Sequence, residues 1–514
     1  MPHGKTALTW ISLLSEDLVQ ARPTSSEVSD SLASGARSDR GSAALGLRRR
    51  LALVARGALP LGIGVVLVLL SVACFRHDTT PPNVVIIVID TLRADHLEHF
   101  GYHRRTAPDL DEFVSNAAVF TNCRAPASWT CPSVASVMTG LLPARHGASE
   151  FGATLPAEHL TLAEALKSAG YHTAAISFNP GVRSELQFDQ GFDEFDEYLG
   201  KTAHYPDVSE MLDRLETWLD AKPPQPFFLY LQPMNVHGPY RVPQEHRADL
   251  LGRAPSREFR YWGETMRRVL RRRDQDLTVR DRIPESFRQS LIDQYDTAIH
   301  YTTGVTADML KALEQRGLLD PSLVIITADH GEELLDHGGF SHGYSLYDEV
   351  LHVPLYLKLP HQSRHATVDR AVTLMDIYPT VLDAVGLSTN TDLDGTSLAP
   401  LVTGGGEGSE RESRLFEGRW QGRCIARSLE VDGYKVIEIE QNYEGLRGVV
   451  QLFNLEADPD ERVDLAGEQP QRSESLQSRL AVLFDEAIAR QVGKSENRVD
   501  DLDQERMRAL GYIE

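Results

Sequence analysis

The chain has 514 residues, of which 41% are hydrophobic and 25% charged, and its formal net charge is −22. That length allows one large α/β domain with a smaller partner, because single cores stop growing at about 250–300 residues. The excess of acidic residues argues against nucleic-acid binding, which depends on clustered Lys and Arg. Four cysteines are too few for a disulfide scaffold. Cys123 and Cys131 could pair in an oxidising compartment, or remain two free thiols.

The N-terminal region combines a polar stretch with an apolar one. Residues 1–56 are rich in Ser, Arg and Ala, which predicts disorder. From Gly57 to Cys74 no side chain is charged, over a length near the lower limit of about 17–25 residues for a bilayer span. Arginines precede this run, and the positive-inside rule then places the N-terminus in the cytoplasm. We expect residues 57–75 to form a single-pass anchor in a bacterial membrane, with the remainder in the periplasm. A signal segment, with lipidation of Cys74, is the alternative.

Strands and helices alternate along the centre of the chain. Continuous apolar and β-branched runs predict strands buried on both faces of a parallel sheet, at residues 83–90, 172–177, 226–233 and 322–329. Helical patterns lie between them, at residues 160–170, 208–220 and 286–317. This alternation predicts a wound α/β fold with a large, mostly parallel (mixed) sheet flanked by helices. Ligands of such folds bind at the carboxyl ends of the strands, where Asp90 and Asp329 lie.

Two further stretches differ in composition from this core. Residues 257–282 are strongly basic in an acidic protein, which favours a solvated helical insertion over a lid or a contact with anionic groups. After a glycine-rich linker at residue 404, shorter strand-like runs appear. We therefore expect a catalytic domain at residues 83–403, and a small C-terminal α+β subdomain with a tail at residues 404–514.

Four segments carry side chains suited to chemistry on an anionic ester. They are IDTLRADHL from Ile89, WTCPSVASVMTGLLPARHG from Trp129, NVHGPY from Asn235, and TADHGEELLDHGGFSHGYSLYDEVLHVPL from Thr327. Asp and His at the ends of buried strands are common ligands of divalent metals. A hydroxyl at the start of a helix lies where backbone N–H groups favour an anion. Together these features suit transfer of a tetrahedral oxyanion group.

The four segments together resemble the sulfatase family, within the alkaline phosphatase superfamily. The match covers the chain from Asn83 to Ala466, and includes DIYPTVLDAVGL, DLDGTSLAPLV and QLFNLEADPDERVDLA, which are similar to segments of bacterial members. The resemblance implies an alkaline-phosphatase-like fold. It also implies a hydrolase of sulfuric or phosphoric esters, with an anionic ester as substrate.

The resemblance also assigns metal ligands and proton donors. It gives Asp90, Asp329 and His330 as ligands of one divalent ion, and we expect Ca²⁺, Mn²⁺ or Zn²⁺ there. His237 matches a family histidine near the leaving-group oxygen, and His342 stands where many sulfatases have a sulfate-binding lysine. Either histidine could protonate the leaving group.

Other positions depart from the family pattern or have supporting roles. Thr91 stands where many members have a second Asp, and Asn179 is the remaining polar side chain where sulfatases have a Lys-x-His pair. Both are candidates for substrate binding. Arg93 and His146 are candidates for bracing the nucleophile loop.

The family nucleophile is a formylglycine made from cysteine, or from serine in some bacteria, with Pro two residues later and Arg four residues later. Aligning the Pro-Ser pair with this pattern puts Thr130 in the nucleophile position and Val134 in place of the Arg. If Cys131 were the modified residue, Ser133 would replace the Pro and Ala135 the Arg. Threonine is not converted to formylglycine, so we expect no formylglycine here.

Three hypotheses about function follow from this alignment. The first is a metal-dependent hydrolase with Thr130 as nucleophile, favouring phosphoester or phosphonate cleavage or phosphoryl transfer, because a metal can activate a threonine hydroxyl. The second is a sulfatase that acts on sulfate esters. The third is a membrane-anchored binding protein that has lost catalysis.

Overall fold

The computed structural model describes residues 81–150, 152–197, 206–253, 283–388, 392–404, 411–420, 424–441 and 448–496. The proposed disordered segment 1–56, the apolar segment 57–75 with Cys74, and the basic stretch 257–282 lie outside these residues. Within the described part of the chain, no helix is both long and apolar enough to cross a membrane.

An eight-stranded mixed sheet forms the centre of the protein, which confirms the predicted α/β architecture. β10 runs antiparallel to both of its neighbours, and the other strands of this sheet are parallel to one another. In spatial order the strands are β11 (Ala366–Val368), β2 (Ala118–Phe120), β10 (Leu355–Lys358), β7 (Leu323–Thr327), β1 (Val84–Val88), β6 (Phe227–Gln232), β4 (His172–Ser177) and β5 (Glu194–Glu197).

The central strand β1 illustrates why the sequence forms this sheet. All five of its residues are Val or Ile, and each is 0% exposed. Branched side chains on both faces are typical of a parallel strand covered by helices on each side. The four strands predicted from the sequence are all observed, as β1, β4, β6 and β7, with ends that differ by no more than two residues.

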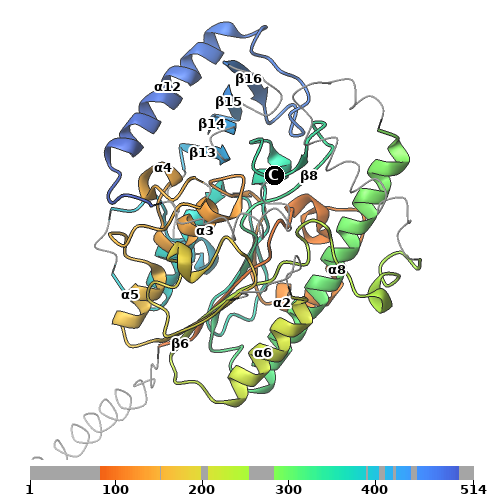
Figure 1. The fold of residues 1–514 in the computed structure, drawn as a ribbon, viewed down its shortest axis with the longest axis vertical. Helices are drawn as coiled ribbons and strands as arrows, with labels where there is room; N and C mark the ends of the chain where they lie inside the picture. The colour runs from red at the N-terminus through yellow and green to blue at the C-terminus, as the bar shows by residue number, and fades with distance from the viewer. Residues whose placement is uncertain are drawn as a thin grey trace, which may run out of the picture. The chain divides into compact units, whose positions relative to one another are not determined.

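Helices cover both sides of the sheet (Figure 1). α6 and α8 lie side by side on one side, and α3, α4 and α5 lie on the other. α5 begins with a capping box formed by Thr161 and Glu164, and α6 begins where the Asp207 side chain accepts from the Ser209 N–H. The helices are α2 (Asp111–Val114), α3 (Thr130–Thr139), α4 (Pro143–His146), α5 (Leu162–Ser168), α6 (Val208–Asp220), α8 (Glu285–Gln315), α9 (Asp348–Leu351), α10 (Ile377–Ala384), α11 (Ala399–Thr403) and α12 (Pro470–Ala489).

The order of the strands decides which loops meet. β7, β1, β6 and β4 are neighbours and run parallel, so the segments that follow them emerge at one edge of the sheet. Those segments contain, in the same order, Asp329, Asp90, His237 and Asn179. Residues that are far apart in the sequence are thereby collected at the carboxyl edge, where α/β proteins bind ligands.

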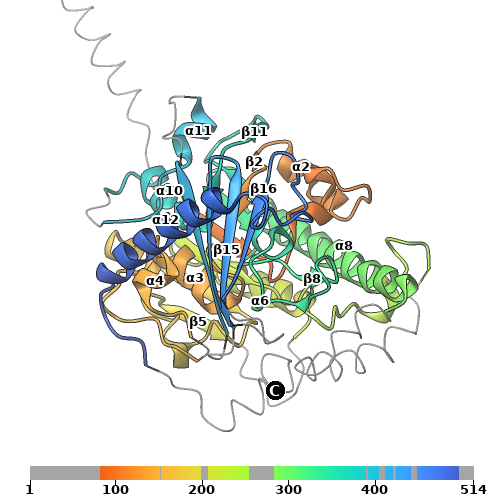
Figure 2. The same ribbon diagram turned by 90° about the horizontal axis from the view of Figure 1, so that it is seen from above.

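The C-terminal part is a four-stranded antiparallel sheet with α12 packed across it (Figure 2). Its strands are β13 (Ser413–Trp420), β14 (Cys424–Val431), β15 (Tyr434–Gln441) and β16 (Val449–Asn454). β13 also contacts the segment that leads into α3, since the Glu417 N–H donates to the Pro126 carbonyl at 3.1 Å. Two small pairs complete the sheets, β3 (Cys123–Arg124) with β12 (Val372–Thr373), and β8 (Glu333–Leu334) with β9 (Phe340–Ser341).

A buried ion pair ties β15 to the main sheet domain. The Lys435 ammonium is 0% exposed, and lies 2.7 Å from Glu461 Oε1 and 3.5 Å from Asp348 Oδ1. Asp348 begins α9 and also binds Arg124 at 2.6 Å. Removing one partner of a buried pair leaves an uncompensated charge, which destabilises more than the intact pair stabilises.

We predict that Glu461→Gln lowers the free energy of unfolding by about 3–5 kcal/mol, because Lys435 remains buried without its nearest counter-charge. Chemical denaturation of the full chain measures this. Glu440→Gln, which loosens the more exposed Arg427–Glu440 pair between β14 and β15, is the matched control and should change stability by about 1 kcal/mol or less. Equal effects of the two substitutions would contradict the assignment.

Candidate active site

Two buried carboxylates face each other at the carboxyl edge of the sheet. Asp90 follows β1 and Asp329 follows β7, and both are 0% exposed. Asp90 Oδ2 accepts from the Asn179 side chain, and Asp329 Oδ1 accepts from the backbone N–H groups of Thr91 and His330 at 3.2 and 3.0 Å. Burial, and then the neighbouring charge of Asp329, raises the pKa of Asp90 well above its usual range.

The second oxygen of each of these two carboxylates lacks a hydrogen-bond partner among the described residues. No hydrogen-bond donor of the described residues reaches Asp90 Oδ1 or Asp329 Oδ2, although both atoms are buried. His330 adds a nitrogen to the same cluster, since its Nδ1–H donates to the Gly331 carbonyl at 2.9 Å and leaves Nε2 as the acceptor. Ligand atoms of Asp90, Asp329 and His330 all lie within 4.8 Å of one another. Two orphaned carboxylate oxygens beside an imidazole nitrogen fit a divalent cation.

Thr130 lies against this cluster. It is the first residue of α3, and it is 1% exposed. Thr130 Oγ1 is 3.3 Å from His330 Nε2, and accepts from Asn179 Nδ2 at 3.2 Å. The Asn179 amide is itself oriented, because its Oδ1 accepts from the Gly181 N–H at 2.6 Å. The hydroxyl therefore sits between the proposed metal ligands and the N-terminus of a helix.

The neighbouring thiol has a different environment. Cys131 Sγ donates to the Gly181 carbonyl at 3.1 Å, and burial raises the pKa of the thiol to about 12. A side chain at position 181 would lie only 2.9 Å from this sulfur, so the 179–181 loop packs directly on it. Cys123 and Cys131 are both free thiols, which excludes the pairing interpretation in this structure.

Three histidines gather beside the carboxylates. The ring centroid of His342 lies 4.4 Å from that of His330 and 5.0 Å from that of His237. Burial lowers the pKa of all three, to about 3 for His237 and to about 4 for His330 and His342. The structure thus brings the segments after β6 and after β7 together around one centre.

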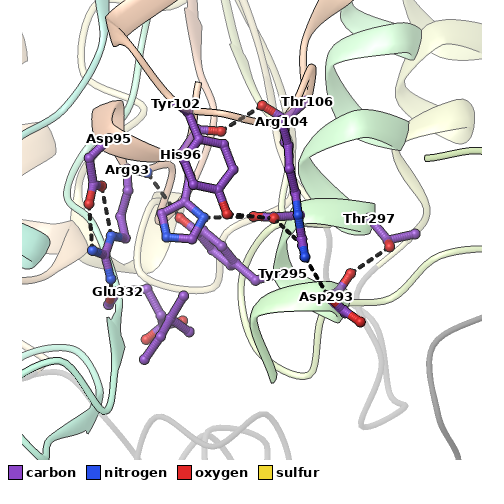
Figure 3. A network of polar contacts seen from close by, with 12 residues as sticks. Arg93, Asp95, His96, Tyr102, Arg104, Thr106, Asp293, Tyr295, Thr297 and Glu332 are labelled. Atoms are coloured by element: carbon purple, nitrogen blue, oxygen red, sulfur yellow. Dashed lines mark hydrogen bonds and ion pairs between the residues drawn. The ribbon is translucent and has the colours of Figure 1, made fainter. Parts of the chain in front are cut away.

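The turn between Asp90 and Arg93 is held in a strained conformation. Thr91 has φ of 57°, a left-handed value that is unfavourable for a β-branched residue. The Tyr295 hydroxyl donates to the Thr91 carbonyl at 2.6 Å and accepts from the Arg93 N–H at 2.9 Å. Figure 3 shows Tyr295 of α8 near Arg93 and His96. The Thr91 hydroxyl is buried, and no partner among the described residues binds it.

Arg93 and His146 brace different parts of the site. The Arg93 guanidinium binds the Asp95 carboxylate, Asp336 Oδ2 at 2.8 Å and the Glu332 carbonyl at 3.0 Å (Figure 3). It therefore supports the loop after His330, and not the nucleophile loop as the sequence suggested. His146 Nε2 lies 3.1 Å from the Pro132 carbonyl, which places its support on α3 itself.

Sequence reasoning missed Glu332 and Gln232. Gln232 Nε2 approaches Asp90 Oδ2 at 3.4 Å, and Glu332 Oε1 lies 3.0 Å from His342 Nδ1. Burial raises the pKa of Glu332 to about 7. The available signal was an acidic residue two positions after His330, at the start of the acidic pair in DHGEELLDHGG.

The fold and the centre together define an alkaline-phosphatase-like α/β protein with a buried carboxylate–histidine cluster that fits a metal. The sulfatase family matches residues 82–387, and the chain belongs to that family. A second family, described as the C-terminal region of N-sulphoglucosamine sulphohydrolase, matches residues 336–488.

Known relatives and solved structures are similar over most of the chain. Arylsulfatase K of Gallus gallus is 24% identical over 446 residues, which is 78% of this chain and 82% of the relative. The phosphonate monoester hydrolase of Agrobacterium radiobacter has a TM-score of 0.63 at 20% identity, and covers 79% of this chain and 96% of its own. A protein solved with its substrate D-glucosamine-2-N,6-O-disulfate has a TM-score of 0.60 at 19% identity, and covers 79% and 98%.

We predict that the full chain, stripped by a chelator, binds one divalent ion at Asp90, Asp329 and His330. Calorimetric titration with Ca²⁺, Mn²⁺ and Zn²⁺ measures this, and Asp90→Asn should abolish it. Asp111→Asn is the control, since Glu98, His99 and Asp111 form a second, more exposed cluster of possible ligands. At an ion concentration about 100 times Kd, binding should add about 2.7 kcal/mol to stability.

The same substitution should have opposite effects with and without the ion. In metal-free protein, Asp90→Asn removes the repulsion between two buried carboxylates and should raise Tm. In the presence of the bound ion, the wild type should be the more stable protein. A lower Tm for the variant in chelator would contradict this account of the centre.

Proposed function

We propose that this protein hydrolyses anionic esters, with Thr130 as the nucleophile and with phosphoesters or phosphonate esters as the favoured substrates. The observation that carries the proposal is the contrast between two neighbours. The Thr130 hydroxyl contacts His330 and Asn179 beside the carboxylates, whereas the Cys131 thiol is buried against the Gly181 carbonyl. The structural similarity to a phosphonate monoester hydrolase is consistent with it, although at 20% identity that similarity concerns the fold.

The chain's own residues then have defined roles. A divalent ion held by Asp90, Asp329 and His330 would supply Lewis-acid stabilisation of negative charge on oxygen. The Thr130 hydroxyl loses its proton to solvent, Thr130 Oγ1 forms a bond to the central atom of the ester, and the bond to the leaving oxygen breaks. Backbone N–H groups of the first turn of α3 stabilise the developing charge. His237 or His342 delivers a proton to the leaving oxygen, and water releases the group from Thr130.

Asn179 supports the choice of substrate class. It holds Asp90 and Thr130 with a neutral amide, at a place where the resemblance leads us to expect a lysine. A neutral donor contributes less than a cation to binding a strongly charged oxyanion. Substrates with a single negative charge therefore suit this centre better than phosphate monoesters, which carry up to two; phosphodiesters, phosphonate monoesters and sulfate monoesters are all of this singly charged kind.

Sulfate-ester hydrolysis is the second candidate, and a specific observation favours it. The two regions of similarity to sulfatases and to the sulphohydrolase C-terminal region together span residues 82–488. Arylsulfatase K aligns over most of the chain. These relatives are hydrolases by name, so they lend no support to phosphoryl transfer to an acceptor alcohol.

We predict that the full chain, loaded with Mn²⁺, Zn²⁺ or Ca²⁺, turns over an aryl phosphodiester or aryl phosphonate monoester faster than an aryl sulfate. Thr130→Ala should reduce kcat by at least about 10³-fold, because the covalent route is lost. Cys131→Ala is the matched control and should retain activity. Sulfate turnover that survives Thr130→Ala but is lost in Cys131→Ala would overturn the nucleophile assignment. Metal binding without turnover of any ester would favour a binding protein.

We further propose that residues 57–75 anchor the protein in a membrane, with the sulfatase-family part in the periplasm. The support is the uncharged run from Gly57 to Cys74 behind a cluster of arginines. We predict that the expressed chain sediments with membranes and resists extraction by salt and by carbonate. Metabolic labelling with palmitate, compared between the wild type and Cys74→Ser, distinguishes an apolar span from a lipid anchor.

A further inference from the structure

A buried carboxylate that the mechanism above does not use lies beside one of the proposed proton donors. Glu332 is 1% exposed, and its Oε1 is 3.0 Å from Nδ1 of His342. Glu332 follows His330 by two residues, whereas His342 lies at the far end of the β8–β9 hairpin. The β8–β9 hairpin therefore brings His342, just after its second strand, next to Glu332, just before its first strand.

Glu332 also contacts the segment that carries the other proton donor. The Tyr240 hydroxyl and the Gly238 backbone lie near enough to its carboxylate to act against the rise in its pKa. A Cβ on Gly238 would lie 4.0 Å from Glu332 Oε2, so the backbone next to His237 passes close to this side chain. One carboxylate thus connects the loop after β6 with the hairpin after β7.

The backbone of Glu332 is fixed independently of its side chain. Its carbonyl accepts from Arg93 Nη1 at 3.0 Å, and its N–H donates to the Glu349 carbonyl at 3.1 Å. The preceding Gly331 packs so closely that an added Cβ would lie 2.1 Å from the Glu349 carbonyl oxygen. The carboxylate is therefore presented to His342 from a rigid support.

A carboxylate that accepts from one ring nitrogen decides which tautomer a histidine adopts. With the Nδ1–H donated to Glu332, Nε2 of His342 is the atom that takes up a proton from solvent and passes it to the leaving oxygen. The ring plane is fixed as well, between His330 and His237. A rotated or alternative-tautomer imidazole would present the wrong atom to the reacting oxygen.

We propose that Glu332 is a positioning residue that holds His342 in the Nδ1–H tautomer, and so directs Nε2 toward proton exchange in the ester-cleavage reaction. This inference rests on the proposed function for its kinetic consequence. Glu332 itself does not touch the reacting atoms. It acts through His342 alone, so its contribution should vanish when His342 is absent.

A double-mutant cycle on the metal-loaded full chain tests this dependence. Glu332→Gln keeps the volume but removes the negative charge that favours the Nδ1–H donor of His342, and should lower kcat about 10–100-fold with KM nearly unchanged. In a His342→Ala background, the same substitution should have no further effect on kcat. Glu332→Asp, which keeps the carboxylate, should recover part of the loss.

The control is a second carboxylate–histidine pair outside the centre. Glu194 Oε1 lies 2.7 Å from His172 Nε2 on the β4–β5 strand pair, so Glu194→Gln makes the same chemical change without touching His342 or the support of Glu332. Its kcat should stay near that of the wild type. If Glu332→Gln still reduces kcat in the His342→Ala background, the positioning role is wrong, whichever ester is the substrate.

Failure of the proposed function is distinguishable from failure of this inference. If aryl sulfate is the ester that turns over, the phosphoester preference is wrong and the cycle is run on the sulfate. If no ester turns over, the cycle is run on unfolding free energies. Coupling between Glu332→Gln and His342→Ala then supports the contact, and additive effects overturn it.

Discussion

The repulsion between Asp90 and Asp329 is the constraint on which the rest of the site depends. Both carboxylates are fully buried at the ends of neighbouring parallel strands, and each has one oxygen that no described donor reaches. Burying two like charges is unfavourable unless a cation or protons neutralise them. The surrounding groups, from Asn179 to the backbone N–H groups of Thr91 and His330, satisfy the remaining oxygens and leave one direction open for a cation.

The elements around these two carboxylates hold the turn that follows Asp90 in a strained conformation. Thr91 adopts a left-handed conformation between Asp90 and Arg93. The hydroxyl of Tyr295 on α8 hydrogen-bonds to the backbone of this turn at both ends. Arg93 in turn holds the loop that carries Glu332 and His342. Such strain persists only where the surroundings determine the backbone, and it is common at functional sites. The rigid frame explains how residues from four strand ends can meet at one edge of the sheet.

The C-terminal sheet contributes to this frame although it supplies none of the residues assigned to the centre. β13 contacts the segment before Thr130, and Lys435 of β15 is buried against Asp348 of α9. His337 lies in the same segment after β7 as Glu332. Its Nε2 is 2.9 Å from the backbone carbonyl oxygen of Glu461 in the C-terminal part. The four-stranded C-terminal sheet therefore stabilises the loops that carry the active-site residues.

The sequence by itself determined the central strands, the helices between them and the family, because apolar runs and short motifs are local properties. It also determined the candidate ligands, since Asp90 and Asp329 directly follow predicted strands. Only the tertiary structure decided that Thr130 faces the cluster while Cys131 faces Gly181, because that depends on where α3 begins. Glu332, and the true contacts of Arg93, were likewise beyond the sequence. Their partners include His342 and Asp336, and only the folded chain brings these within hydrogen-bond reach.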